Sequence, residues 1–209
     1  MKCLIFDIDG TLWDSRALVA EGYNIQLRKE GYDHLCVTAE DLKPLFGKVM
    51  TEIADAILAS VPVNQRYALM ERCMDTENRY LAENECRIGY DGVKETLEEL
   101  ARSYRLFIVS NAQCGYPELC MEKLGIGHLI EGHLCFGDTG TEKGQTILEL
   151  MRRHHIDDAV YIGATQGDYE ATVVAGIPFI WAAYGFGNPS AAAAKICQIC
   201  DLPQAVQAL

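Results

Sequence analysis

Two aspartates two residues apart, Asp7 and Asp9, stand directly after a short apolar run near the start of the chain. The run, residues 4–6, predicts a short buried strand. Because side chains alternate across an extended segment, both aspartates should point to the same side as the strand ends. Two carboxylates this close repel each other unless a cation or a proton lies between them. The pair therefore predicts a site that binds a cation or a proton.

The next two residues, Gly10 and Thr11, favour anion binding beside this acidic pair. Gly10 permits an unusual backbone turn, and Thr11 offers a hydroxyl and an N–H where the chain leaves the strand. The alternative is an ordinary acidic turn, since Asp and Gly are common turn residues. The rest of the chain decides between the two interpretations.

Four more apolar segments predict buried strands, at residues 106–109, 134–136, 160–162 and 178–181. Residues with helical spacing separate them, for example Val93, Leu97 and Leu100. Strands that alternate with helices predict a mostly parallel sheet with helices on both faces, which is a doubly wound α/β fold.

Residues 15–88 differ from this pattern, because they contain helical spacing and no strand signal. They predict an all-helical domain inserted between the first and second strands. The α/β core should then consist of residues 1–14 and 89–209, with the helical cap at 15–88.

Polar residues follow the other predicted strands, and an open parallel sheet binds ligands beyond the carboxyl ends of its strands. Ser110 and Asn111 follow the second strand, Lys143 follows the third, and Asp168 closes a polar segment after the fourth. A hydroxyl, an ammonium and several carboxylates at one edge suit a phosphoryl group with Mg²⁺. Taken singly, Ser110-Asn111 is also compatible with a turn and Lys143 with a solvated helix residue.

These segments, in this order, resemble the four motifs of the haloacid dehalogenase (HAD) superfamily. The matching segments are Asp7-Ile8-Asp9-Gly10-Thr11, Ser110-Asn111, Lys143 and residues 163–168. The helical insertion is similar to the small cap of the phosphoglycolate phosphatase and β-phosphoglucomutase branch. The resemblance covers essentially the whole chain and implies a Rossmann-like core.

The resemblance also implies roles for the two aspartates. Asp7 would be the nucleophile that forms an aspartyl-phosphate. Asp9 would protonate the leaving alcohol and then deprotonate the water that cleaves the intermediate. Because dehalogenases and phosphonatases of this superfamily lack the second aspartate, Asp9 favours a phosphate ester as the substrate.

Further residues follow from the same resemblance. The phosphate oxygens would be held by Gly10, Thr11, Ser110, Asn111 and Lys143. Lys143 would also be catalytic, because it would offset the negative charge of Asp7 and the phosphate. Mg²⁺ would be bound by Asp7, the backbone carbonyl of Asp9, and Asp168. One position departs from the pattern: the fourth motif of the family is GDxxxD, and Ala164 stands where its first acid is expected.

The function implied is a Mg²⁺-dependent phosphatase of small phosphate esters that resembles phosphoglycolate phosphatase. Because alanine cannot bind a metal, a catalytically weakened or inactive binding or regulatory protein is one alternative. A β-phosphoglucomutase-like phosphotransferase is the other. Lys48, in a predicted cap loop, is the candidate contact for a second anionic group of the substrate, although a solvated lysine fits it equally well.

Composition limits the partners. The chain has 18 basic and 30 acidic residues, a formal net charge of −12, which argues against nucleic acid or an anionic membrane as the main partner. A small phosphorylated metabolite remains compatible with this charge. A bound metal ion and nearby hydrogen-bond donors can make the electrostatic potential positive at one site. We expect a monomer or weak homodimer.

The nine cysteines are scattered, and the chain opens directly into a predicted strand, so we expect free thiols in the cytoplasm. The pair Cys197 and Cys200 forms a CxxC, but no second ligand pair lies near it in sequence. Asp138 and Glu142 offer another acidic pair, which precedes Lys143 and so breaks the motif order. Neither pair is favoured as a metal site.

Overall fold

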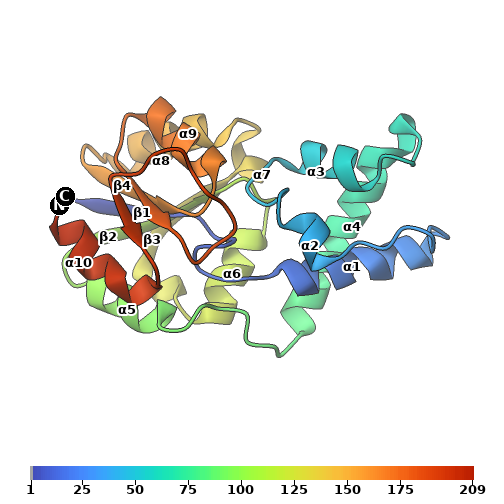
Figure 1. Cartoon of the computed structure of the whole chain (residues 1–209), viewed down its shortest axis with the longest axis horizontal. Helices are drawn as coiled ribbons and strands as arrows, with labels where there is room; N and C mark the ends of the chain where they lie inside the picture. The colour runs from blue at the N-terminus through green and yellow to red at the C-terminus, as the bar shows by residue number, and fades with distance from the viewer. Residues whose placement is uncertain (1) are drawn as a thin grey trace. The chain divides into compact units, whose positions relative to one another are not determined.

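The computed structural model describes residues 2–209 and contains a sheet of six strands, all parallel, in the order β3-β2-β1-β4-β5-β6 (Figure 1). The strands are β1 (Cys3–Phe6), β2 (Arg105–Ser110), β3 (Ile130–Cys135), β4 (Ala159–Gly163), β5 (Phe179–Ala182) and β6 (Ala194–Ile196). The first strand of the sequence is thus central, with β2 and β4 on either side. The predicted doubly wound α/β fold is confirmed.

Two strands differ from the sequence prediction. β3 begins at Ile130, four residues before the predicted apolar segment, because Glu131 and His133 interrupt its apolar pattern. β6 was not predicted: its three residues begin in an alanine run, and alanine has little preference for strands. β6 forms at the sheet edge by pairing with β5.

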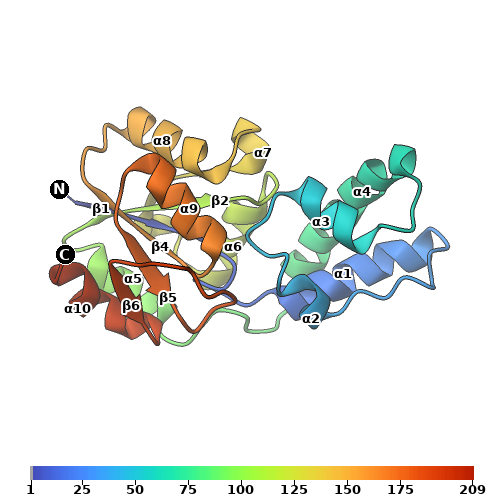
Figure 2. The ribbon, with the colours of Figure 1, turned by 45° about the horizontal axis from the view of Figure 1, so that its top comes forward.

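Within residues 2–209, six α-helices belong to the same unit as the sheet. They are α5 (Val93–Leu100), α6 (Tyr116–Leu124), α7 (Phe136–Thr139), α8 (Lys143–His154), α9 (Gln166–Ala175) and α10 (Leu202–Gln207). α8 and α9 cover one face of the sheet, whereas α5, α6 and α10 lie on the other (Figure 2). α6 and α9 end at Gly125 and Gly176 in the left-handed conformation, as their sequences indicated.

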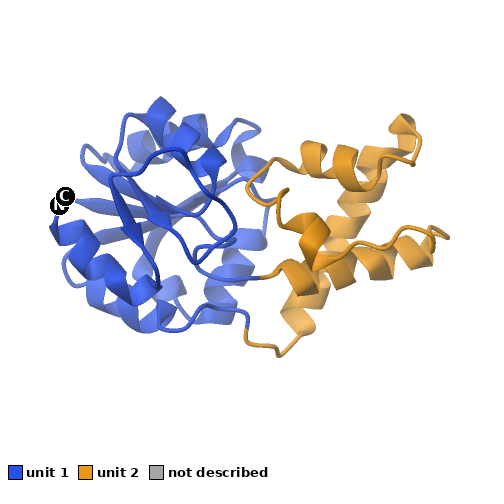
Figure 3. Cartoon of the chain, viewed as in Figure 1, with its two compact units in different colours: residues 1–14, 88–209 blue, residues 15–87 orange. Residues whose placement is uncertain are grey.

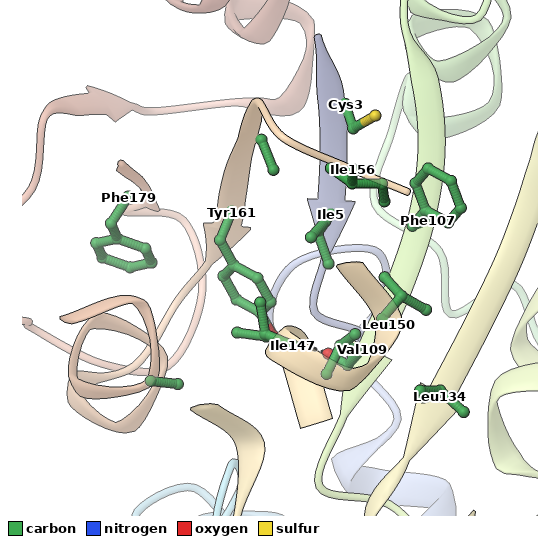
Figure 4. Packing of buried hydrophobic residues seen from close by; sticks show 12 residues of the cluster. Cys3, Ile5, Phe107, Val109, Leu134, Ile147, Leu150, Ile156, Tyr161 and Phe179 are labelled. Carbon is green, nitrogen blue, oxygen red and sulfur yellow. Dashed lines mark hydrogen bonds between the residues drawn. The ribbon is translucent and has the colours of Figure 1, made fainter. Parts of the chain in front are cut away.

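The core beneath α8 is built from alternate residues of the central strands (Figure 4). Ile5, Val109 and Tyr161 lie in this cluster with Ile147 and Leu150 of α8, all with less than 1% of their surface exposed. The Tyr161 hydroxyl donates to the Val109 carbonyl oxygen at 2.8 Å, so its buried polar group is satisfied. This packing holds the three central strands in fixed register below the site.

The chain divides into two compact units, residues 1–14 with 88–209 and residues 15–87 (Figure 3). Ile88 thus belongs with the sheet, one residue earlier than the sequence indicated. The reason is a backbone hydrogen bond from Asp14 N to the Ile88 oxygen at 2.8 Å, which ties the two ends of the insertion together within the first unit.

The second unit is all-helical over the described residues, as predicted. It contains α1 (Arg16–Lys29), α2 (Ala39–Leu42), α3 (Met50–Ile57) and α4 (Val63–Glu83). α1 and α4 pack closely at Gly22, where an added Cβ would lie 2.8 Å from the Glu77 Cα. Across residues 2–209, no helix combines the length and apolar character needed to cross a lipid bilayer.

Candidate active site

The proposed nucleophile follows the central strand directly. Asp7 comes directly after β1, and its N–H donates to the Ile162 oxygen of β4 at 2.9 Å. This bond extends the pairing of β1 with β4 by one residue. Ser110 ends β2 and Ala164 follows β4, so both lie at the carboxyl ends of the parallel strands, as Asp7 does. Ser110 is buried and Asn111, next to it, is half-buried.

A tight turn follows Asp7. Thr11 N and Leu12 N both donate to the Ile8 oxygen, at 3.1 and 2.8 Å, and Gly10 lies in the left-handed region with φ 80°. An added Cβ at Gly10 would also approach the Phe186 ring to 3.0 Å. Both the backbone conformation and the close approach therefore require glycine.

The Thr11 side chain is fully buried, and its hydroxyl has no hydrogen-bond partner within residues 2–209. The Thr11 carbonyl is satisfied, because the Tyr184 hydroxyl donates to it at 2.9 Å. A buried hydroxyl without a partner is unfavourable, so it marks a place where a ligand oxygen would be stabilised. This fits the expected phosphate-binding role of Thr11.

Lys143 joins two of the predicted carboxylates. It opens α8, only 4% of its side chain is exposed, and its Nζ lies 2.9 Å from Asp7 Oδ1 and 2.6 Å from Asp168 Oδ1. The three residues stand far apart in sequence and come from the ends of different strands or the helices after them. We call Asp7, Lys143 and Asp168 the buried triad.

The buried triad shifts the pKa values of its members. Burial, followed by the negative charge of Asp168, raises the pKa of Asp7 to about 7, although Lys143 acts in the opposite direction. Burial alone would lower the pKa of Lys143, but Asp168 and Asp7 outweigh it and raise that pKa above its ordinary value. Lys143 therefore remains an ammonium beside Asp7 throughout the neutral range.

Asp168 is held by its own helix. Its Oδ2 accepts from Ala164 N at 3.0 Å, Thr165 N at 2.9 Å and the Thr165 hydroxyl at 2.8 Å, while Asp168 N donates back to that hydroxyl. This reciprocal cap starts α9. Three donors thus lie on Oδ2 and Lys143 lies on Oδ1, so both oxygens of the carboxylate already accept from the protein. The geometry thus favours Asp168 as the residue that orients Lys143 over direct coordination of a metal.

Ala164 is fully buried and offers no ligand atom. Its methyl group packs against glycine, since an added Cβ at Gly185 would lie 2.5 Å from it. The expected ligands that remain are the Asp7 carboxylate and the Asp9 carbonyl. This set fits a weakly held Mg²⁺, because Mg²⁺ keeps several waters and takes one or two carboxylates together with substrate phosphate.

Asp9 has two donors that the sequence analysis did not identify. Trp13 Nε1 donates to Asp9 Oδ1 at 2.8 Å, and the Tyr116 hydroxyl donates to the same oxygen at 2.9 Å. The two rings pack edge to face with centroids 5.4 Å apart. Trp13 lies two residues after the first motif, so its contact with Asp9 is local in sequence. Tyr116 lies 107 residues from Asp9, and no local pattern connects the two.

The remaining predicted residues lie elsewhere. Lys48 belongs to the helical unit, where its Nζ lies 3.6 Å from the Glu52 carboxylate, so its contact with substrate stays a prediction. Asp138 caps α7 by accepting from Cys135 N at 2.9 Å. Cys197 and Cys200 are exposed free thiols.

The family of this chain follows from its sequence as a whole. A profile of haloacid dehalogenase-like hydrolases matches residues 4–182, a range that includes the buried triad, Asp9 and Tyr116. The chain belongs to the haloacid dehalogenase-like hydrolase family. The predicted resemblance to this superfamily is thereby confirmed.

Curated relatives agree with this membership, and a solved structure shares the fold. The chain is 26% identical over 196 residues to the phosphoglycolate phosphatase of Xanthomonas campestris pv. campestris (strain 8004), covering 88% of this chain and 84% of the relative. It is 25% identical over 207 residues to that of Aliivibrio fischeri, covering 90% and 86%. The crystal structure of a predicted phosphoglycolate phosphatase from Haemophilus somnus 129PT superposes with a TM-score of 0.83 at 22% identity, over 99% and 98% of the two chains. This last similarity shows the fold.

Proposed function

We propose that this hydrolase is a Mg²⁺-dependent phosphatase that cleaves small phosphate esters through a phosphorylated Asp7. The observation that carries the proposal is the contact of Lys143 with Asp7, a buried carboxylate at the end of the central strand. A buried carboxylate beside a fixed ammonium is suited to attack an anionic phosphoryl group, because the ammonium offsets the combined negative charge.

In the first step, the Asp7 carboxylate attacks phosphorus and the bond from phosphorus to the ester oxygen breaks. The oxygens of the transferred group would be held by the Thr11 hydroxyl, the turn at Gly10, and Ser110 with Asn111. Thr11 supports this role, because its buried hydroxyl has no partner within the described residues. Lys143 stabilises the charge that accumulates between Asp7 and the phosphoryl group.

Asp9 would act as the general acid of the first step and the general base of the second. It gives a proton to the leaving alcohol, then takes one from the water that cleaves the acyl phosphate and restores Asp7. The hydrogen bonds from Trp13 and Tyr116 fix the orientation of the Asp9 carboxylate for both transfers.

The Asp7 carboxylate and the Asp9 carbonyl would hold Mg²⁺, whose positive charge would neutralise phosphate oxygens. Members of this family are typically Mg²⁺-dependent. Asp168 would contribute through Lys143, and because Ala164 supplies no ligand, we expect weak metal binding and slow turnover. A regulatory protein with little activity is the second candidate, and Ala164 is the observation in its favour.

For the substrate, we propose a small phosphomonoester that carries a second anionic group, of the phosphoglycolate type. The support is the similarity to phosphoglycolate phosphatases, together with Lys48 as a cation in the helical unit. A panel of charged and neutral phosphate esters should show a preference for the charged ones that Lys48→Ala reduces. Equal relative rates in the two proteins would show that Lys48 does not contact the substrate.

The test of the reaction itself is phosphate release by the purified protein, Asp7→Asn and the control Asp157→Asn with saturating Mg²⁺. Asp157 is an exposed aspartate of the same unit. We expect Asp7→Asn to abolish turnover, because an amide is no nucleophile here, and the control to retain it. Full activity in Asp7→Asn would contradict the proposed mechanism. Absence of activity in the native protein with every ester would favour the regulatory protein.

A further inference from the structure

A second group of metal-ligand side chains lies outside the residues of the proposed active site. Cys114, Cys135 and Asp138 place their ligand atoms within 4.8 Å of one another. Cys114 lies in the loop after β2, Cys135 ends β3, and Asp138 lies in α7. We propose that these three residues form a Zn²⁺ site, with water as the fourth ligand. We call them the thiol–carboxylate cluster.

Two distances within the cluster are close to those between ligands of one ion, and all three ligand atoms lie within 4.8 Å of one another. Cys135 Sγ lies 3.1 Å from Asp138 Oδ2, and Cys114 Sγ lies 3.7 Å from Asp138 Oδ1. Zinc bonds are about 2.3 Å long to sulfur and about 2.0–2.2 Å to oxygen, which puts tetrahedral ligands roughly 3.5 Å apart. Only small side-chain shifts are therefore needed to bind an ion.

The backbone brings the two cysteines together through a glycine. Gly137 N donates to the Ala112 oxygen at 3.1 Å, which joins α7 to the loop after β2. An added Cβ at Gly137 would lie 2.4 Å from Cys114 N and 2.8 Å from Cys114 Sγ. The absence of a side chain at position 137 is thus what allows Cys114 to approach α7.

The simpler explanation is that Cys135 and Asp138 only cap α7. Cys135 N does donate to Asp138 Oδ2 at 2.9 Å, and this accounts for the orientation of the carboxylate. A cap does not account for Cys114, which comes from another loop and contacts the same carboxylate. Cysteine is also absent from the preferred capping residues, which are Ser, Thr, Asp and Asn.

The ligand types select the metal. Two thiolates favour Zn²⁺ over Mg²⁺ and Ca²⁺, which take oxygen ligands. Cys114 and Asp138 are exposed, so an ion has access and water has room to complete the tetrahedron. Binding would release the thiol protons, since thiolates are the ligands.

The test is a titration with Co²⁺, which replaces Zn²⁺ and absorbs strongly by charge transfer only when thiolates coordinate it. The background protein carries Cys197→Ser and Cys200→Ser, so that the exposed CxxC does not contribute. In this background we expect one Co²⁺ per chain with thiolate absorption, displaced by Zn²⁺. Asp7→Asn should leave the absorption unchanged, which separates this site from any oxygen-ligand site at Asp7.

Matched variants test the assignment. Cys114→Ser and Cys135→Ser should each weaken binding by more than about tenfold and reduce the absorption. Cys86→Ser, another exposed thiol, should have no effect. Ser at position 135 keeps a capping side chain, so far-ultraviolet circular dichroism should be unchanged. Absorption that is absent in the background protein, or that survives both serine variants, would overturn the proposal.

Discussion

At the scale of single residues, Lys143 determines whether Asp7 is usable as a nucleophile. Asp7 is 1% exposed, and burial together with Asp168 raises its pKa to about 7. An attacking carboxylate has to be ionised, and the ammonium 2.9 Å away is what keeps that form accessible near neutral pH. The chemistry of the site thus depends on a balance of charges within the buried triad.

We predict that Lys143→Met lowers kcat by about 10²–10³-fold, because the charge that develops at the phosphoryl group loses its fixed cation. It should also destabilise the fold by about 3–5 kcal/mol, since two buried carboxylates are left facing each other. Steady-state kinetics and urea unfolding measure the two effects. Lys94→Met, which removes an exposed lysine, is the control. A kcat equal to that of the native protein would contradict the role of Lys143.

Tyr116 gives a second prediction at this scale. Tyr116→Phe should reduce kcat by about tenfold with little change in KM, because the ring packing on Trp13 remains while one donor to Asp9 is lost. Tyr104→Phe, elsewhere in the same unit, should behave as the native protein. If KM rose and kcat stayed constant, Tyr116 would contact substrate instead of positioning Asp9.

The third prediction at this scale concerns position 164. Ala164→Asp should lower the Mg²⁺ concentration needed for half-maximal rate by at least about tenfold, because it adds a carboxylate ligand. Ala164→Asn has nearly the same size without the charge, so it controls for packing beside Gly185. The ratio of the two activities, measured across a Mg²⁺ titration, separates coordination from steric effects. Equal responses in the two variants would place the metal away from residue 164.

The residues of the buried triad could be predicted because each follows an apolar segment, and because their order along the chain resembles that of a known family. Tyr116 could not, because its link to Asp9 exists only once α6 packs on the sheet. Nor could the three hydrogen bonds to Asp168 Oδ2, which depend on the geometry of its helix cap.

At the scale of elements, the central strands of the sheet were predictable from the sequence, and the outer strands β3 and β6 were not. β1, β2 and β4 are buried on both faces, so their sequences are continuous apolar runs. β3 is partly exposed and carries polar residues, so its start was predicted too late. The three residues of β6 owe their conformation to pairing with β5, and that information lies outside their own sequence.

At the scale of the whole molecule, the helical insertion leaves and re-enters the core at one place. Asp14 N bonds to the Ile88 oxygen at 2.8 Å, and Trp13 bridges to Gly89. Replacing residues 16–86 by a short Gly-Ser linker should therefore leave a core that folds, since such a loop closes with little entropic cost. Circular dichroism and a cooperative urea transition would show this. A chain without a cooperative transition would mean that the core depends on the insertion.

The most direct test of the central claim is to trap the intermediate on Asp7. The protein is mixed with a substrate and Mg²⁺, quenched in acid during turnover, and reduced with borohydride, which converts an aspartyl-phosphate to homoserine. We predict homoserine at position 7 and at no other aspartate, and none in Asp7→Asn. Turnover of the ester without homoserine at position 7, or with homoserine elsewhere, would contradict the assignment of Asp7 as the nucleophile.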